Sequence, residues 1–258
     1  MAKIITIANQ KGGTGKTTTA LCLGAELEQK GFKVLYIDLD TQGNLSFSLR
    51  NNEEHKNIKE IFKKNNACID VKELIQVNDL KQNFISAGED LNTTLNTISD
   101  SVGKEYRLKE SIKPILKQYD FILIDTAPGL NLGLVNALSC SDYLIIVVNA
   151  DRYSLRACDD IQAIVESVKA YTNKKLKVGG LLVNKYKQRQ ALSQQINDIL
   201  EEVAKEYKTK VFNTHIRECV AISESQAIQQ PITTYAPKSN GNIDYLSFTE
   251  EVLKDLKG

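Results

Sequence analysis

The feature that most constrains the fold is a glycine-rich segment between a short apolar run and an amphipathic segment. Residues 4–8 are apolar apart from one threonine, residues 9–15 contain three glycines, and apolar residues then recur at helical spacing. A strand, a glycine loop and a helix in this order let backbone N–H groups turn inward around an anion. Because a helix N-terminus also carries partial positive charge, the sequence predicts a phosphate-binding loop.

The loop is the segment Lys11-Gly12-Gly13-Thr14-Gly15-Lys16-Thr17-Thr18. We expect Lys16 to reach the β- and γ-phosphates of a nucleotide, and the Thr17 hydroxyl to coordinate Mg²⁺ directly. The strict pattern G-x-x-x-x-G-K-[ST] is not met, because Gln10 stands where its first glycine would be. A second lysine, Lys11, begins the loop instead.

Short runs rich in β-branched residues recur along the chain and alternate with segments of helical period. The runs are Ile4–Ala8, Val34–Asp38, Phe84–Ala87, Phe121–Asp125, Tyr143–Asn149, Val178–Asn184 and Val211–Ile216. The helical segments are Thr17–Lys30, Glu105–Gln118, Leu132–Ser139, Ser154–Tyr171 and Gln188–Tyr207. Several runs are apolar at consecutive positions, as in parallel strands buried on both faces. The alternation predicts an α/β fold: a doubly wound, mostly parallel sheet with helices on both faces.

Residues 44–104 depart from this alternation, since they are richer in Asn and Lys and weaker in periodicity. We expect short helices there, as an elaboration within one domain that spans residues 1–258. Pro114 falls inside a helical segment and predicts that this helix kinks or starts late.

Composition argues against several classes of protein. The net charge is +1, so any basic surface for nucleic acid or membrane must be local. The five cysteines include no C-x-x-C pair and only His55 and His215 could assist them, which argues against a zinc or cluster site. No apolar run approaches the ~20 residues of a membrane span, and no signal peptide opens the chain. These features predict a cytoplasmic protein.

The phosphate loop resembles the deviant Walker A motif of the ParA/MinD superfamily. That resemblance implies that Lys11 reaches across an ATP-sandwiched homodimer to the phosphates bound by the partner. A cation delivered in this way can stabilise the charge that develops during phosphoryl transfer. Hydrolysis of ATP would then require dimerisation.

Further segments are similar to the partition ATPases of the ParA/Soj branch, and the similarity runs over essentially the whole chain. They are Asn9-Gln10 before the loop, Asp38–Asn44 after the second run, and the closing stretch from Ile232 to Tyr245. Thr41 stands where this branch usually has proline, which affects the stiffness of the loop more than its chemistry. Because the phosphate loop starts at residue 11, the resemblance is to the small form without an N-terminal helix-turn-helix domain.

Acidic residues follow two of the predicted strands. Alternation places Asp38 and Asp40 on one face at the carboxyl edge of the sheet, where open α/β folds bind ligands. Asp40 would position or activate the attacking water and Asp38 would hold the Mg²⁺ shell through water, although either could instead cap the next helix. The run that ends at Asp125 resembles a Walker B segment, which implies a contact of Asp125 with the metal through water. In that case Thr126–Leu130 would be the switch that senses the γ-phosphate.

The resemblance implies an ATPase for plasmid or chromosome partition with weak intrinsic activity. Binding of ATP would drive homodimerisation and sequence-independent binding to double-stranded DNA of the nucleoid. A ParB-like adaptor bound at a centromere-like site would stimulate hydrolysis and reset the cycle.

The resemblance also implies an adenine pocket formed by Asn184 and Pro237. The implied DNA contacts are Lys185, Lys187, Arg189 and Arg217. On its residue type alone, Asn184 could equally make a turn at a strand end. The lysines and arginines could equally form a solvated face.

Other functions stay open beside this one. A membrane-cycling ATPase like MinD needs a basic amphipathic C-terminal helix. The tail Tyr245–Leu256 has an apolar stripe beside several acids, which an anionic bilayer would repel, so we expect it to pack on the core and bind no membrane. An iron–sulfur protein related to nitrogenase reductase would need paired cysteines near the switch, where Cys140 stands alone. An ATPase that positions another cargo, or an ATP-binding dimerisation switch with negligible turnover, is a further alternative.

Overall fold

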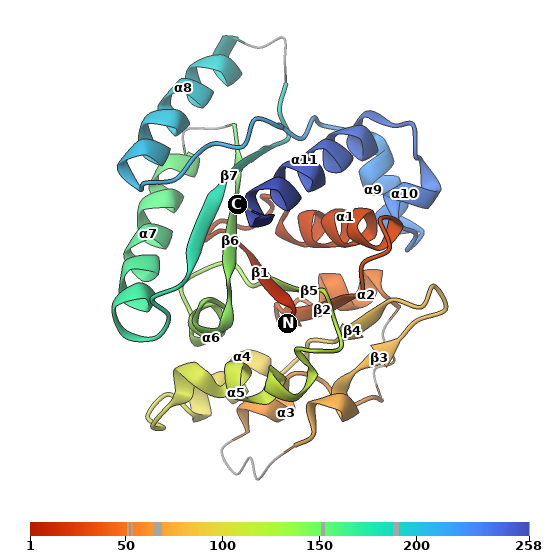
Figure 1. Cartoon of the computed structure of the whole chain (residues 1–258), viewed down its shortest axis with the longest axis vertical. Helices are drawn as coiled ribbons and strands as arrows, with labels where there is room; N and C mark the ends of the chain where they lie inside the picture. The colour runs from red at the N-terminus through yellow and green to blue at the C-terminus, as the bar shows by residue number, and fades with distance from the viewer. Residues whose placement is uncertain (51, 53, 64–68, 151–152, 188–190, 258) are drawn as a thin grey trace.

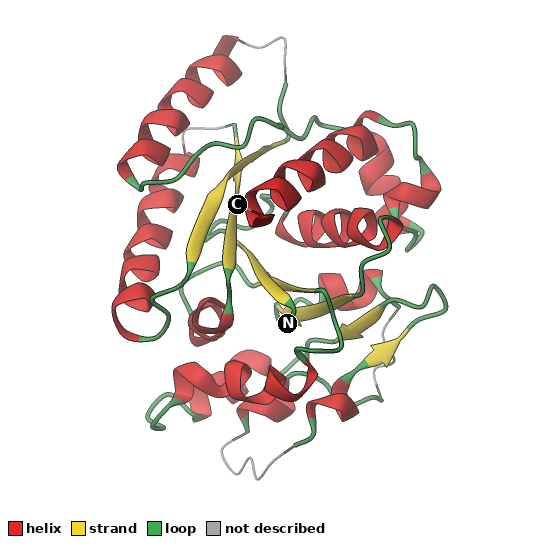
Figure 2. Cartoon of the chain, viewed as in Figure 1, coloured by secondary structure: helices red, strands yellow, loops and turns green. Residues whose placement is uncertain are grey.

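The computed structural model describes residues 1–50, 52, 54–63, 69–150, 153–187 and 191–257. Seven strands of this part of the chain form one sheet, with helices on both of its faces (Figure 2). The strands are β1 Lys3–Ala8, β2 Val34–Leu39, β3 Gln76–Val77, β4 Asn83–Ile85, β5 Phe121–Thr126, β6 Tyr143–Asn149 and β7 Lys177–Asn184. Their order in the sheet is β3-β4-β2-β5-β1-β6-β7. Neighbouring strands run parallel except β3, which pairs antiparallel with β4.

The helices of the described residues follow the strands in alternation along most of the chain (Figure 1). They are α1 Lys16–Gln29, α2 Asn44–Ser48, α3 Lys59–Phe62, α4 Leu91–Thr97, α5 Arg107–Ile112, α6 Leu132–Cys140, α7 Tyr153–Tyr171, α8 Ala191–Glu206, α9 Val220–Ala227, α10 Ile232–Tyr235 and α11 Asn240–Lys257. Short 3₁₀ turns cover Val71–Leu74, Lys104–Tyr106 and Lys113–Ile115. None of these described helices carries an apolar stretch long enough to cross a bilayer.

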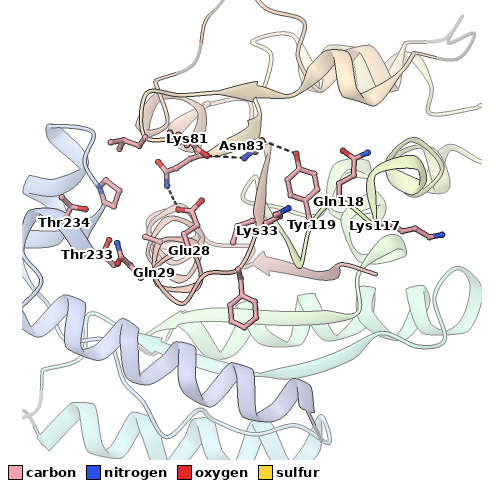
Figure 3. A pocket seen from close by; sticks show the side chains of 16 residues that line it. Glu28, Gln29, Lys33, Lys81, Asn83, Lys117, Gln118, Tyr119, Thr233 and Thr234 are labelled. Atoms are coloured by element: carbon pink, nitrogen blue, oxygen red, sulfur yellow. Dashed lines mark hydrogen bonds between the residues drawn. The ribbon is translucent and has the colours of Figure 1, made fainter.

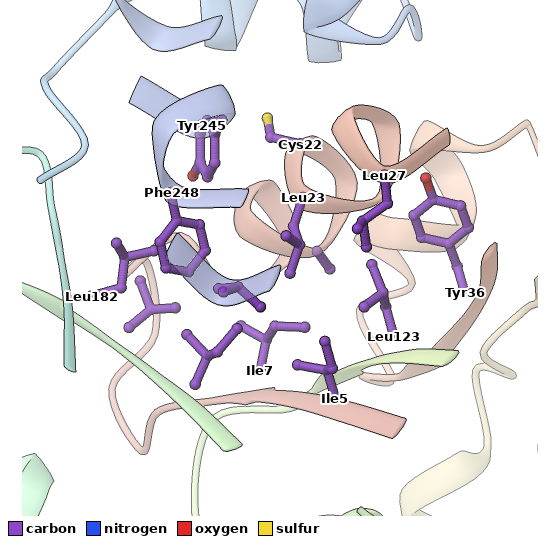
Figure 4. Packing of buried hydrophobic residues seen from close by; sticks show 14 of the residues in the cluster. Ile5, Ile7, Cys22, Leu23, Leu27, Tyr36, Leu123, Leu182, Tyr245 and Phe248 are labelled. Atoms are coloured by element: carbon purple, nitrogen blue, oxygen red, sulfur yellow. The ribbon is translucent and has the colours of Figure 1, made fainter. Parts of the chain in front are cut away.

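The central strands are buried on both faces, as their continuous apolar runs predict. Consecutive residues of β1 enter different layers: Ile4 packs with α5 and α6, whereas Ile5 packs with α1 and α11. Figure 4 shows the second layer, in which Leu23 and Leu27 of α1 and Phe248 of α11 lie on the same side of the sheet. The predicted doubly wound, mostly parallel α/β fold is therefore confirmed.

Residues 44–104 contribute β3 and β4 to the same sheet, with α3 and α4 packed on one of its faces and Leu45 of α2 in the layer of α1 on the other. Leu91 and Leu95 of α4 and Ile61 of α3 belong to the same buried cluster as Ile122 of β5. The expectation of short helices in this segment is confirmed, whereas the two-residue strand β3 was not predicted.

Two predicted elements differ from the structure. The run Val211–Ile216 is not a strand: it forms an isolated bridge from Val211 to Leu181, and the Ile216 N–H donates to the Val183 carbonyl at 2.9 Å. The reason is that the N–H groups of Asn213 and Thr214 donate to the carboxylate of Glu251, at 3.0 and 3.1 Å, instead of to a neighbouring strand.

The predicted helix Glu105–Gln118 is interrupted. It consists of a 3₁₀ turn, α5, and a second 3₁₀ turn that contains Pro114. Proline lacks an N–H donor and its ring clashes with the carbonyl four residues earlier, so α5 ends at Ile112. Pro114 thus interrupts the segment, but the predicted kink or late start is wrong, because the helix ends at Ile112.

The apolar stripe of the C-terminal tail packs on the core, as expected. Tyr245, Phe248 and Val252 of α11 are fully buried, and the ring of Phe248 meets Phe212 edge-on with centroids 4.9 Å apart. Their burial against α1 and the sheet leaves this stripe covered.

This packing predicts that Phe248→Ala destabilises the protein by about 3–5 kcal/mol, the usual cost of removing a buried aromatic side chain. Phe47→Ala is the matched control, because Phe47 is 62% exposed. Urea unfolding followed by circular dichroism compares the two free energies of unfolding. Equal effects of the two substitutions would show that α11 does not stabilise the core.

Candidate functional site

The glycine-rich loop leaves β1 at the carboxyl edge of the sheet and enters α1. Asn9 anchors its start, since its Nδ2 donates to the Val147 carbonyl at 2.6 Å and its Oδ1 accepts from the Lys11 N–H at 2.8 Å. Gly13 and Gly15 have φ values of 72° and 99°, in the left-handed region that favours glycine. Glycine at these positions therefore lets the loop curve back on itself without backbone strain.

Lys16 is buried at the first turn of α1, with 6% of its surface exposed. Its Nζ donates to the Lys11 carbonyl at 3.2 Å across the loop. Burial lowers the pKa of this ammonium, while the nearby carboxylates of Asp125 and Asp40 raise it. The phosphate loop thus holds a poorly hydrated cation, which is available to a polyanion.

Thr17 and Asp125 meet at the base of the loop. The Thr17 hydroxyl donates to Asp125 Oδ2 at 2.6 Å, and Asp125 Oδ1 is buried without a hydrogen-bond partner in the described structure. Burial raises the pKa of Asp125, and the neighbouring charge of Asp38 raises it further. A hydroxyl and a buried carboxylate oxygen in contact are hard oxygen donors of the kind that Mg²⁺ prefers.

Asp38 stands directly across from Asp125 in the register of β2 and β5. One of its carboxylate oxygens accepts from the Asp40 N–H at 2.9 Å, and the other accepts from Ser46 N–H and Oγ at 2.8 and 2.7 Å. Burial is the main cause that raises its pKa to about 6. Both oxygens are engaged by protein donors, so the geometry favours the alternative that Asp38 anchors α2 over a magnesium role.

Asp40 follows β2 at the mouth of the site and is 6% exposed. Its Oδ1 accepts from the Gln42 N–H at 3.0 Å, which fixes the carboxylate in a tight turn. Asp40 lines the same pocket as Lys16 and Thr17. The structure therefore brings the predicted catalytic carboxylate to the phosphate loop.

The pocket over the loop has a volume of about 810 Å³, and we call it the nucleotide pocket. Its walls come from the loop, from α2, from the end of β7 and from α9. Gly12, Gly13, Gly15, Lys16, Thr17, Thr18 and Asp40 line it among the predicted site residues, with Asn184, Lys185 and Arg217. Thr14 is buried beneath the loop.

Asn184 ends β7 and touches the loop from the side. Its Nδ2 donates to the Thr14 carbonyl at 2.7 Å, and a Cβ added at Gly15 would lie 2.1 Å from this nitrogen. Pro237 does not line the nucleotide pocket but is exposed beyond α10, where its carbonyl accepts from Asn242 Nδ2 at 3.1 Å. The structure brings only one of the two predicted adenine-binding residues to the pocket.

The predicted DNA-binding residues have partners within the chain. Lys185 Nζ donates to the Gly13 carbonyl at 3.0 Å, and Lys187 pairs with Glu218 at 3.1 Å. The Arg217 guanidinium forms a forked ion pair with Asp244, with its shortest contact at 2.6 Å. Arg189 lies outside the described residues.

Several residues of the nucleotide pocket were missed by the sequence prediction. Gln226 of α9 donates from Nε2 to Thr18 Oγ1 at 3.0 Å, and Phe47 and Ile222 line the pocket from α2 and α9. These side chains come from helices far from the loop in sequence and belong to no motif. No signal in the sequence could have identified them.

The site fits a nucleotide and Mg²⁺. A Cβ added at Gly12 or Gly13 would meet nothing within 4 Å, so their backbone is open to an approaching phosphate. The unpartnered Asp125 Oδ1 and the Thr17 hydroxyl supply oxygen donors beside the loop. Fold and site together define the class of P-loop NTPases.

Comparisons with known proteins narrow this class. A family model described as an AAA domain matches residues 2–178. The sporulation initiation inhibitor protein Soj of Bacillus subtilis is 34% identical over 98% of this chain and 98% of its own. The chain belongs to the ParA/Soj family of partition ATPases.

Solved structures agree on the fold. The cobyrinic acid a,c-diamide synthase of Mycobacterium smegmatis, solved with an ATP analogue and magnesium, is 26% identical and superposes with a TM-score of 0.85 over 100% of this chain and 97% of its own. A plasmid partition protein of Borrelia burgdorferi, solved with AMPPNP, is 28% identical with a TM-score of 0.78 over 99% of this chain and 98% of its own.

The contact between Gly15 and Asn184 predicts that Gly15→Ala destabilises the protein by about 1–3 kcal/mol. The new methyl group would collide with Asn184 while the backbone is held at positive φ. Gly12→Ala is the matched control, since its Cβ would lie in open space at ordinary φ. Thermal unfolding without nucleotide compares the variants, and equal melting temperatures would contradict the prediction.

Proposed function

We propose that this chain, as one ATPase domain over residues 1–258, partitions DNA through cycles of ATP binding and hydrolysis. The observation that carries the proposal is that Lys16, Thr17 and Asp40 line one pocket at the carboxyl edge of the sheet, with the buried Asp125 hydrogen-bonded to Thr17. Membership of the ParA/Soj family supports the choice of cargo. That cargo is a plasmid or a chromosome.

The chain's own residues account for nucleotide binding. Lys16 and the N–H groups of the glycine loop bind the β- and γ-phosphates, and the dipole of α1 supports them. The Thr17 hydroxyl, with Asp125 behind it, would hold Mg²⁺, which neutralises charge on the phosphate oxygens. Asn184 borders the loop where a nucleobase would lie.

Hydrolysis assigns further roles to Asp40 and Lys11. The Asp40 carboxylate orients a water for attack, and its fixed turn keeps it in place. Lys11 reaches into the site of a second copy and stabilises the charge that develops on the phosphate there. Hydrolysis of ATP is thereby limited to the homodimer, so its rate is controlled by dimer assembly.

The dimer then binds double-stranded DNA without sequence preference. Lys185, Lys187, Arg189 and Arg217 supply the phosphate contacts, and those among them that the structure describes lie at or near the mouth of the nucleotide pocket. A ParB-like adaptor that is itself bound to DNA stimulates hydrolysis. Hydrolysis releases the dimer from the DNA of the nucleoid.

We expect binding to a random-sequence duplex only with ATP, and with strong dependence on salt. If the dimer makes about six phosphate contacts, log K falls with log[salt] at a slope near −5, a roughly thousandfold loss between about 50 and 200 mM. Fluorescence anisotropy of a labelled duplex measures this with ATP, with ADP and without nucleotide. Lys16→Ala is the control, because it loses nucleotide binding and with it DNA binding. An affinity that is the same in all three nucleotide states, or flat with salt, contradicts DNA partition but leaves the nucleotide site intact.

Asp40→Ala should trap the ATP-bound dimer on DNA, since nucleotide binding is retained while the attacking water loses its base. The variant is expected to lose about 10²–10⁴-fold in turnover, the typical contribution of a positioned general base. Phosphate release and light scattering of the nucleotide-loaded variant measure turnover and mass. A monomeric Asp40→Ala protein with ATP would overturn the role assigned to this residue.

A further inference from the structure

A second large pocket lies at the opposite edge of the sheet from the nucleotide pocket. Its volume is about 820 Å³, and its walls come from the end of α1, the starts of β2 and β4, and the segment around α10 (Figure 3). We call it the lysine groove, and define it by Glu28, Lys33, Lys81, Gln82, Lys117 and Thr233. None of these residues belongs to the nucleotide site.

The rim of the lysine groove is positively charged. Lys33, Lys81 and Lys117 are exposed, and no carboxylate in the described part of the chain forms an ion pair with their ammonium groups. The Asp120 side chain lies nearby, but it accepts from the backbone N–H of Lys33 at 2.8 Å. The cations are therefore available to an anionic partner.

The floor of the groove offsets little of this charge. Glu28 is the single acid among the described lining residues, and it accepts from Gln82 Nε2 at 2.9 Å. Burial raises the pKa of Glu28, which favours its neutral form. A carboxylate that enters the groove thus meets three ammonium groups and one acid, whose carboxylate is hydrogen-bonded to Gln82.

The groove also offers apolar and hydrogen-bonding surface. Leu80 is 48% exposed at its edge, and Phe32 and Pro231 line its wall. The exposed side chains of Gln29, Gln118 and Thr234 line it and can hydrogen-bond to a ligand. Figure 3 shows the lining side chains spread from Thr233 and Thr234 at one end, past Glu28, to Lys117 at the other.

We propose that the lysine groove docks an acidic peptide segment of a partner protein. Complementary charge between the three unpaired lysines and acidic side chains selects the partner and steers its approach. Leucine-sized side chains of the segment fit against Leu80 and Phe32, while the amide and hydroxyl groups of the walls bind its backbone. A volume near the upper end of ordinary ligand pockets accommodates several residues of an extended chain.

The nucleotide pocket does not compete for this segment. Thr17 and Thr18 at the start of α1 line the nucleotide pocket, whereas Glu28 near its end lines the lysine groove. With a rise of about 1.5 Å per residue, the helix separates the two by about 15 Å. Docking can therefore be measured with nucleotide bound, and it stands or falls independently of DNA partition.

The test uses a fluorescein-labelled peptide with the sequence Glu-Glu-Leu-Glu-Glu, and the same peptide with every Glu replaced by Gln. Anisotropy is measured on the full chain with saturating ADP, which occupies the other basic pocket. We expect the acidic peptide to bind below about 1 mM and to weaken with salt, and the Gln peptide to bind at least tenfold more weakly. The double variant Lys81→Glu/Lys117→Glu should lose at least tenfold in affinity.

The matched control is Lys174→Glu/Lys175→Glu, which changes the net charge equally at exposed lysines between α7 and β7. It should keep the affinity of the unmodified chain, and peptide-induced shifts of amide resonances should map to the residues of the groove. Failure of the acidic peptide to bind by about 1 mM would overturn the proposal. Equal binding of the Gln peptide, or equal losses in the two double variants, would also overturn it, because each indicates non-specific attraction.

Discussion

The nucleotide pocket depends on one buried cation, the ammonium of Lys16. The order of the strands brings to this ammonium the carboxylates that stabilise it. Burial disfavours its charged form, and the carboxylates of Asp125 and Asp40 offset that cost. These groups follow or end β1, β2 and β5, which are neighbours in the sheet. Because parallel strands end at one edge, the three meet there without any contribution from a second domain. A different strand order would leave the lysine buried and unpaired, which is costly.

The same edge stores electrostatic strain. Asp38 and Asp125 face each other on adjacent strands, both fully buried, and the charge of Asp38 raises the pKa of Asp125. Ser46 and Thr17 donate hydrogen bonds that stabilise the two carboxylates, but Asp125 Oδ1 receives none from the described residues. Two acids and an unpartnered oxygen are unfavourable in an isolated protein and favourable beside a divalent cation. The unfavourable burial of these carboxylates in the free protein is thus consistent with a site for nucleotide and Mg²⁺.

Much of this could be predicted from the sequence, because its causes are local. The run Tyr143–Asn149 gave a strand with the same bounds, and the segment from Lys11 to Thr18 gave the phosphate loop. Other outcomes depend on side chains distant in sequence. The Glu251 carboxylate accepts from N–H groups that would pair with a neighbouring strand if Val211–Ile216 were a strand. The Ser46 N–H donates to the carboxylate of Asp38. No periodicity or propensity records such pairs, so they became visible only in the folded chain.

The acids of α11 form ion pairs and hydrogen bonds within the chain, which composition does not reveal. Glu251 and Asp255 pair with Lys210, Asp255 accepts from the Tyr143 hydroxyl, and Asp244 holds Arg217. These acids bind α11 to the segment that follows β7. Their charges are therefore paired within the molecule rather than presented to a bilayer or a DNA duplex. Arg217 can contact DNA only by leaving Asp244. That ion pair is forked, and its Asp244 side chain is only 10% exposed, so moving the guanidinium to a polyanion would leave a largely buried carboxylate without this partner. The proposed contact of Arg217 with DNA therefore has to offset the loss of its pair with Asp244.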